Sequence, residues 1–156
     1  MTILHVITSI EPGGAEHHLL SLAKSQVKGG NKVLLAFMKN TVRNLTSEFE
    51  EAGVILYPMG LSYYGEIKPI LSLRTLIKSE GPDVVHAHLP PAELYARIAM
   101  LGVRKKAFII SKHNDERFAP VPFAVYMARW VAREADCVIC ISRAVKNFWS
   151  QNRVIK

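Results

Sequence analysis

The sequence predicts an α/β fold, a Rossmann-like doubly wound parallel sheet of six to seven strands with helices on both faces. The main observation is that short β-branched or apolar runs alternate with longer amphipathic runs along the whole chain. Alternation of this kind is typical of βα units whose parallel strands are buried between helical layers. The second observation is the length, because 156 residues correspond to one domain. We therefore expect residues 1–156 to form a single unit.

In the first half of the chain, three strand-like runs are each followed by a helical run. The strand-like runs are short and rich in β-branched and apolar residues, whereas the helical runs repeat apolar residues three or four positions apart. Glycine closes each helix, with Gly29 after the first, Gly53 after the second and Gly81 after the third. The expected order is strand 2–9, helix 15–28, strand 32–38, helix 41–52, strand 54–59 and helix 67–79.

The second half repeats the pattern three more times. Its first strand-like run is short and apolar, as in a strand buried on both faces, and Gly102 closes the helix that follows it. A last run at 153–156 resembles the opening of a seventh strand. The expected order is strand 83–87, helix 91–101, strand 107–111, helix 121–134, strand 136–141 and helix 142–150.

Composition excludes several classes of protein architecture but leaves the function open. Hydrophobic residues make up 49% and charged residues 21% of the chain, which excludes disorder, coiled coils, collagen-like repeats and disulfide-stapled miniproteins. The formal charge of +7 favours anionic partners such as nucleic acid, anionic lipid or phosphorylated ligands, although a basic surface without a special partner fits equally. No apolar run approaches the ~18–20 residues of a membrane span, and the N-terminus does not resemble a signal peptide, so we expect a cytoplasmic protein.

Cys137 and Cys140 form a C-x-x-C pair within a strand-like run. Residues three apart in a strand point to opposite faces, so the two thiols cannot share a metal ion or form a disulfide. We therefore expect two buried free thiols.

Unusual residues gather where the expected strands end. Ligands of open parallel sheets bind at the carboxyl ends of the strands. Gly13-Gly14 follows the first strand and opens a helix, which is an anion-binding geometry. His88 follows the fourth strand, His113 follows the fifth, and Ser142-Arg143 follows the sixth. Core packing gives no reason for polar residues to collect there, so we expect a binding site along this edge.

The remaining histidines have a structural interpretation. We expect His5, in the middle of a strand, to be a core residue and His86 to be packed and hydrogen-bonded within the sheet. His17 and His18 are adjacent on a helix and therefore do not form a metal-binding pair, although either could approach His88 across the crevice. A zinc site is disfavoured because no third acidic or cysteine ligand has a suitable spacing.

With these residues in place, the chain resembles the N-terminal domain of a retaining glycosyltransferase of the GT-B fold, family 4. The resemblance extends over essentially the whole chain. Four motifs in the right order carry it: Gly13-Gly14-Ala15-Glu16, the run from Pro82 to His88, the His113 turn, and the run from Ala135 to Ser142.

The resemblance implies roles for individual residues. Gly13 and Gly14 would approach the donor diphosphate and the transferred sugar, with Ser142 and Arg143 helping to hold phosphate. His113 would lie beside the transferred sugar as the catalytic residue, stabilising an oxocarbenium-like transition state or binding a hydroxyl. The acceptor side would be lined by His88 and Glu11.

The resemblance also implies an activity and partners. The parent enzyme would move a sugar from a nucleotide diphosphate sugar to a carbohydrate or lipid-linked acceptor, in polysaccharide, lipopolysaccharide or glycolipid synthesis, with no metal and no cofactor. A C-terminal nucleotide-sugar-binding domain would supply most nucleotide contacts and is missing from the sequence, so we expect residues 1–156 alone to be inactive. The basic residues, with Tyr63 and Tyr64, either face an anionic membrane surface or are solvated surface.

Other classes remain as alternatives. A two-domain GT-B-fold epimerase or synthase would share most of the pattern. A non-catalytic Rossmann-like binding module of the receiver type needs an acidic cluster after the first strand and an aspartate after the third. This chain has Glu11-Pro12-Gly13-Gly14 and Pro58-Met59-Gly60 at those places. Nucleic acid is not expected as a partner, because the basic residues are scattered and lack interleaved aromatics.

Overall fold

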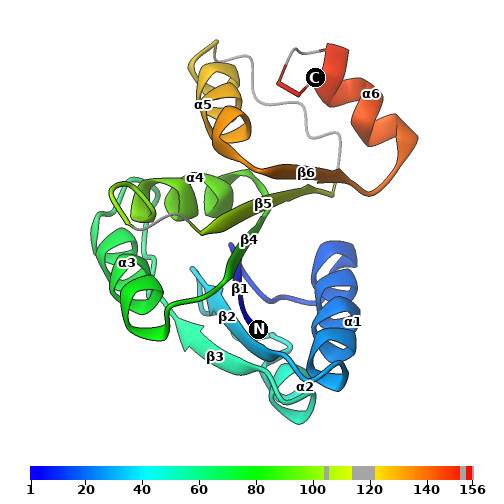
Figure 1. The fold of residues 1–156 in the computed structure, drawn as a ribbon, viewed down its shortest axis with the longest axis vertical. Helices are drawn as coiled ribbons and strands as arrows, with labels where there is room; N and C mark the ends of the chain where they lie inside the picture. Colours follow the sequence, from blue (N-terminus) through cyan, green and yellow to red (C-terminus); the bar gives the residue numbers. More distant parts are fainter. Residues whose placement is uncertain (104–105, 114–121, 152–153, 156) are drawn as a thin grey trace.

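The computed structural model describes residues 1–103, 106–113, 122–151 and 154–155. Six strands alternate with six helices along this part of the chain, as the sequence predicts (Figure 1). The strands are β1 (Thr2–Ile7), β2 (Lys32–Phe37), β3 (Ile55–Pro58), β4 (Val84–His88), β5 (Ala107–Lys112) and β6 (Cys137–Cys140). The helices are α1 (Gly14–Lys28), α2 (Thr46–Glu51), α3 (Lys68–Glu80), α4 (Pro90–Ala99), α5 (Pro122–Glu134) and α6 (Arg143–Gln151).

The strands form one parallel sheet in the order β3-β2-β1-β4-β5-β6. The chain winds outward from β1 through β2 to β3, then crosses back and continues from β4 to β6. The direction therefore reverses between β1 and β4, where Ile7 is aligned with His88. In doubly wound sheets the crevice at the carboxyl ends of two such strands is the preferred place for a ligand.

Two expected elements differ from the observed ones by more than one or two residues at an end. The helix expected at 41–52 is confined to Thr46–Glu51, because side-chain hydrogen bonds build a turn in front of it: Asn44 Nδ2 donates to the carbonyl of Thr41, and the Thr46 N–H donates to Asn44 Oδ1. Bonds of this kind compete with a helix. Val154 and Ile155 do not lie in a strand, so the described residues contain six strands; Arg153 and Lys156, the rest of the expected seventh strand, lie outside them.

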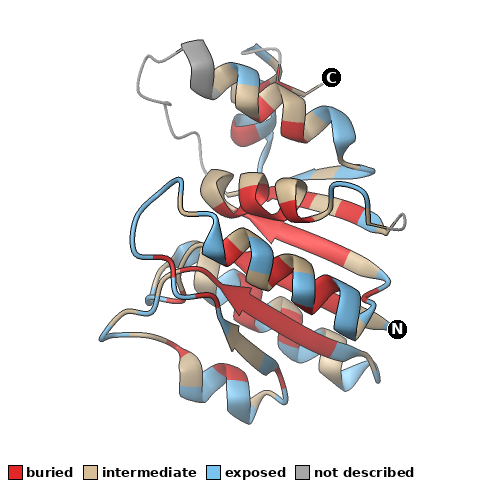
Figure 2. Ribbon diagram, turned by 90° about the vertical axis from the view of Figure 1, so that its left-hand side faces the viewer, coloured by how far each residue is buried: buried red, intermediate tan, exposed pale blue. Residues whose placement is uncertain are grey.

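The central strands are largely buried (Figure 2), and the two faces of the sheet contribute to different cores. Leu4, Val6, Val85 and Ala87 pack with α3 and α4 into the larger apolar core, and α1 and α2 enclose a second core against the other face. Since strand residues two apart share a face, that second face of β1 carries His5 between Ile3 and Ile7, and that of β4 carries His86 and His88. The central strands thus combine an aliphatic face under α3 and α4 with a histidine-containing face under α1.

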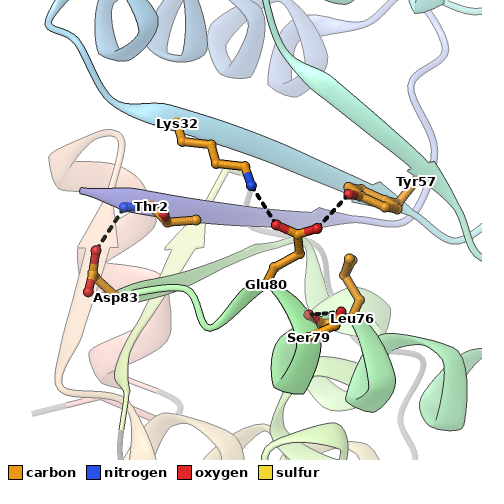
Figure 3. A network of polar contacts seen from close by, with 7 residues as sticks. All are labelled: Thr2, Lys32, Tyr57, Leu76, Ser79, Glu80 and Asp83. Carbon is orange, nitrogen blue, oxygen red and sulfur yellow. Dashed lines mark hydrogen bonds and ion pairs between the residues drawn. The ribbon is translucent and has the colours of Figure 1, made fainter.

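The amino ends of the strands carry a separate polar network (Figure 3). At the end of α3, the Glu80 carboxylate pairs with Lys32 of β2 at 2.6 Å and accepts a hydrogen bond from the Tyr57 hydroxyl of β3 at 3.1 Å. The backbone N–H of Thr2 donates to Asp83 at 2.7 Å. These contacts fasten α3 and the start of β4 to the opposite end of the sheet from the expected site.

The cysteines occupy the last strand of the sheet, and the expectation of two buried thiols is wrong. Both are free, but Cys137 is exposed and Cys140 is only partly buried. The reason is topological, since β6 has β5 on one side and no strand on the other among the described residues. In the described part of the chain, none of the helices has the length and apolar character needed to cross a bilayer.

Candidate active site at the carboxyl ends of the strands

The α1 helix begins at the carboxyl end of β1. Gly13 is its N-cap and makes no side-chain cap, so the first N–H groups of the helix are left available to an anion. Gly13 has an extended backbone, which any residue can adopt, and a Cβ there would meet the flexible Glu16 carboxylate. A Cβ on Gly14 would meet nothing within 4 Å. The fold itself therefore does not require this glycine pair, and the backbone at Gly14 is open to a neighbour from outside.

His113 follows β5 directly, as the sequence predicts, and is partly buried. His88 differs from the expectation of a residue just beyond its strand, because it is the last residue of β4 and is completely buried. The reason is its position in a central strand, where α1 covers the histidine face. His88 still reaches the edge of the sheet indirectly, since its Nδ1 lies 3.1 Å from Nε2 of His113.

The histidines of β1 and β4 continue this contact into the core. His5 Nδ1 lies 3.0 Å from His88 Nε2, and His5 Nε2 lies 2.7 Å from the side-chain oxygen Oε1 of Gln26 on α1. His86 stacks on His88 with 4.1 Å between ring centroids and bonds to the Ser111 hydroxyl at 2.7 Å. The expectation that His5 and His86 are buried residues is confirmed, and His86 is hydrogen-bonded as expected.

Burial keeps this cluster neutral at physiological pH. Desolvation lowers the pKa of His5 to about 4, against a hydrogen bond to Gln26 that raises it. The pKa of His86 falls to about 3 and that of His113 to about 4, again mainly through desolvation. Desolvation and the neighbouring histidines hold the pKa of His88 well below its usual range. Each imidazole therefore has one N–H and one lone pair.

A second buried contact supports the end of β5 from the other face. Lys112 Nζ lies 2.5 Å from Glu93 of α4 and 4.1 Å from the ring centroid of Trp149 on α6. Both charged side chains are completely buried, and burial raises the pKa of the Glu93 carboxyl against the opposing effect of Lys112. Lys112 therefore links three elements directly beneath His113, and its charge is compensated within the protein.

Ser142 and Arg143 begin α6 next to the end of β5, where the Ile141 N–H donates to the Lys112 carbonyl at 3.3 Å. The N–H of Val145 donates to the Ser142 hydroxyl at 3.2 Å, so Ser142 caps the helix. Ser142 and Arg143 are both exposed and line a hollow of about 670 Å³ beside β6. His113 is not among its lining residues. Ser142 and Arg143 therefore lie at the same edge of the sheet as His113 but line a separate hollow.

The structure brings some of the expected site residues together and adds others. His18, on the second turn of α1, lies edge-on to His113 with 5.4 Å between ring centroids, which brings the glycine end of α1 near the β5 end. Glu11 is exposed in the loop after β1, and its acceptor role stays a prediction. Gln26 was missed by the sequence reasoning, although its position seven residues after buried Leu19 marks it as a polar residue on an apolar stripe.

The histidines also fit the spacing of a metal site. His5, His86 and His88 each offer a ring nitrogen, and these atoms lie within 4.8 Å of one another. All three side chains are buried, and the short contact between His5 and His88 is already a hydrogen bond. The expectation of a site without metal stays a prediction.

Comparison with known proteins agrees with this geometry. The model of Glycosyltransferase Family 4 matches residues 12–156. The chain belongs to glycosyltransferase family 4. This match covers the glycine end of α1, strand β4 with His86 and His88, and the start of α6, whereas β1 lies before it. A search of curated protein sequences gives no match.

Solved structures place this family 4 domain in the GT-B fold. HepE from Anabaena, solved with UDP, is 21% identical with a TM-score of 0.77, and the match covers 100% of this chain and 43% of HepE. A glycosyltransferase from Rickettsia africae is 21% identical with a TM-score of 0.75, covering 99% of this chain and 40% of that one. The UDP-GlcNAc 2-epimerase from Methanocaldococcus jannaschii is 14% identical with a TM-score of 0.66, covering 100% and 45%. The chain thus has the fold of one GT-B half and spans less than half the length of these proteins.

Proposed function

We propose that this family 4 domain is the acceptor-side half of a retaining glycosyltransferase, which moves a sugar from a nucleotide diphosphate sugar to an acceptor hydroxyl. The observation that carries the proposal is the meeting of the uncapped α1 N-terminus, His18 and His113 at the β1/β4 switch point. HepE, which shares the fold, was solved with UDP and with UDP and glucose. A nucleotide-sugar donor fits an edge that offers a helix N-terminus and neutral imidazoles.

The proposed roles follow from the local chemistry. The donor diphosphate approaches the free N–H groups at the start of α1, where Gly14 leaves the backbone accessible. His113, neutral because burial lowers its pKa to about 4, contacts the transferred sugar without bringing a positive charge close to an oxocarbenium-like transition state. Lys112 is already paired with Glu93, so neutralisation of the leaving diphosphate falls to a second, nucleotide-binding half.

Epimerisation is the alternative within the same fold. The epimerase likeness rests on 14% identity, which establishes a common fold and no more. The family 4 match over residues 12–156 favours transfer. A non-catalytic module would need no neutral histidine at the ligand edge.

The test is a transfer assay on a polypeptide that joins this chain to its nucleotide-binding half. His113→Asn is expected to lower kcat by about 10²-fold, as expected when a group that stabilises the transition state is lost. His17→Asn is the matched control, because His17 is an exposed neighbour on α1. An unchanged anomeric configuration in the product supports retention. Equal activity of the two variants, or interconversion of the donor sugar without transfer, would overturn the proposal.

We also propose that the acceptor is presented at a membrane surface. The loop after β3 leaves the sheet at the same edge as the site, and it exposes Tyr63, Tyr64 and Ile67 by 66%, 57% and 66%. Lys39 lies 4.2 Å from the centroid of the Tyr64 ring, and Lys68 is exposed beside it. Aromatic rings with flanking lysines suit the interface of an anionic bilayer.

Vesicle flotation tests this second proposal. The chain should float with vesicles containing anionic phosphatidylglycerol and not with purely zwitterionic ones. The double variant Tyr63→Ser and Tyr64→Ser should lose flotation. Leu101→Ser should keep it, because Leu101 is also an exposed apolar residue but lies in the turn between α4 and the amino end of β5. Flotation that is independent of lipid charge, or unaffected by the double variant, would contradict the proposal.

A further inference from the structure

Four polar side chains form an unbroken line of hydrogen bonds from α1 to the site. Gln26 contacts His5 at 2.7 Å, His5 contacts His88 at 3.0 Å, and His88 contacts His113 at 3.1 Å. The line crosses from α1 through β1 and β4 to the residue after β5. Below it is called the histidine chain, meaning Gln26, His5, His88 and His113.

The direction of every bond in the histidine chain follows from its first member. The side-chain oxygen Oε1 of Gln26 can only accept a hydrogen bond. His5 therefore carries its proton on Nε2 and has a lone pair on Nδ1. The contact between His5 Nδ1 and His88 Nε2 then needs the proton on His88 Nε2, which leaves a lone pair on His88 Nδ1. The last contact therefore needs the proton on His113 Nε2.

His113 Nδ1 is the open end of the chain. Among the described residues this buried ring nitrogen has no hydrogen-bond partner, and the Nε2–H tautomer of His113 makes it an acceptor. A buried acceptor without a partner is destabilising and calls for an explanation, such as a ligand that satisfies it. The ring of His18 lies edge-on to His113, and because His18 is exposed, it can move aside without disturbing the core.

We propose that Gln26, His5 and His88 are positioning residues that fix His113 as its Nε2–H tautomer and so present an unprotonated Nδ1 to the bound sugar. His113 then accepts a hydrogen bond from a sugar hydroxyl and cannot donate one to a carboxylate or phosphate. The substrate group at this point is accordingly a neutral hydroxyl. The statement about the sugar rests on the proposed function, whereas the tautomer does not.

Metal binding by His5, His86 and His88 is the competing use of the same atoms. A metal ion between them would take the lone pairs of His5 and His88 and displace the proton that they share at 3.0 Å. The three side chains are buried in the sheet, which leaves little room for a further ligand. The geometry therefore favours hydrogen bonding, and metal binding becomes an outcome of the test.

The test is long-range ¹H–¹⁵N correlation NMR of the 156-residue chain with ¹⁵N-labelled histidine, at neutral pH, after treatment with EDTA. The spectrum distinguishes Nε2–H from Nδ1–H imidazoles, and single histidine variants assign the signals. His5, His88 and His113 should all be Nε2–H tautomers. His113 as an Nδ1–H tautomer would overturn the proposal, as would a shift of the His5 and His88 signals to metal-bound positions on adding Zn²⁺.

Variants of Gln26 test the direction of control. Gln26→Leu removes the acceptor, so the His113 signal should shift towards the Nδ1–H tautomer. Gln26→Glu restores an acceptor and should restore the Nε2–H tautomer. Gln151→Leu makes the same chemical change at an exposed position of α6 and should leave His113 unchanged. Unaltered tautomers in Gln26→Leu would overturn the proposal even if the joined polypeptide transfers sugar. Correct tautomers, together with no transfer by the polypeptide that includes the nucleotide-binding half, would contradict only the proposed function.

Discussion

Lys112 and Glu93 form an enclosed ion pair between β5 and α4, with Nζ and Oε2 2.5 Å apart. Trp149 of α6 covers the ammonium group. The pair lies on the aliphatic face of the sheet, directly beneath the strand end that carries His113. Breaking it would leave one charge buried without a partner, which is the costly case for an internal ion pair.

We predict that Lys112→Met destabilises the domain by about 3–5 kcal/mol, because the Glu93 carboxylate is stranded in the core. The double variant Lys112→Met with Glu93→Leu should recover most of this loss. Lys32→Met is the control, since solvent reaches both side chains of the Lys32–Glu80 pair and solvated pairs contribute little to stability. Urea unfolding followed by tryptophan fluorescence measures all three. Similar losses for Lys112→Met and Lys32→Met would contradict the prediction.

A second prediction concerns pH. The folded pKa values of His5 and His86 are about 4 and about 3, below the ordinary value of 6.5. Between pH 6.5 and 4 the unfolded chain therefore binds protons that the folded chain does not, so the free energy of unfolding falls as the pH falls. Each of these buried histidines contributes a slope of about 1.4 kcal/mol per pH unit in that window. Glu93, whose pKa burial raises, acts in the opposite direction but as a single group.

Urea midpoints at pH 7.5, 6.0 and 5.0 check the second prediction. The midpoint should be highest at pH 7.5 and fall at each step. A midpoint that is constant over this range would show that the histidines are not held neutral by burial.

Gly14 provides a third prediction. Gly14→Ala should leave stability unchanged or slightly raised, because the added methyl group meets nothing within 4 Å and alanine is the better helix former. The same methyl group occupies the space through which a diphosphate would approach, so donor-induced amide shifts should weaken at least severalfold. Gly81→Ala is the opposite control: its left-handed backbone should make it destabilising without affecting donor binding. Unchanged donor binding in Gly14→Ala would contradict the role given to this turn.

A fourth prediction concerns activity. The purified 156-residue chain should show negligible sugar transfer. Lys112 is already paired with Glu93 in the core, and we assign the charges that neutralise the leaving diphosphate to the nucleotide-binding half. A radiolabelled nucleotide sugar with lipid and polysaccharide acceptors makes the assay sensitive. Multiple turnover by the chain alone would refute the prediction.

The fold was predictable from the sequence because its signals are local. Alternating strand and helix patterns, with glycines that close several helices, predicted all six βα units. These units in turn indicated roughly where each strand ends. The turn before α2 was missed because it depends on the side chain of Asn44 bonding to Thr41 and Thr46. The exposure of Cys137 was missed because it depends on the order of strands in the sheet, which no local pattern encodes.

The site was predictable only in part, for a related reason. His113 and the start of α1 could be located from strand ends alone. The contact of His5 with His88 requires the register between β1 and β4, and the contact with Gln26 requires the packing of α1 on that face. Individually, His5 and His86 were correctly interpreted as buried residues, but their connection to His113 is a property of the assembled sheet.

The most direct test of the central claim is an amide chemical-shift map of the chain on titration with UDP-glucose. We expect shifts at Gly13, Gly14 and His113 at the carboxyl ends of the strands. We expect none at Thr2 and Asp83, which lie at the opposite end of the sheet. Shifts confined to the opposite end, or no shifts at millimolar donor, would contradict the claim that this edge holds the donor sugar.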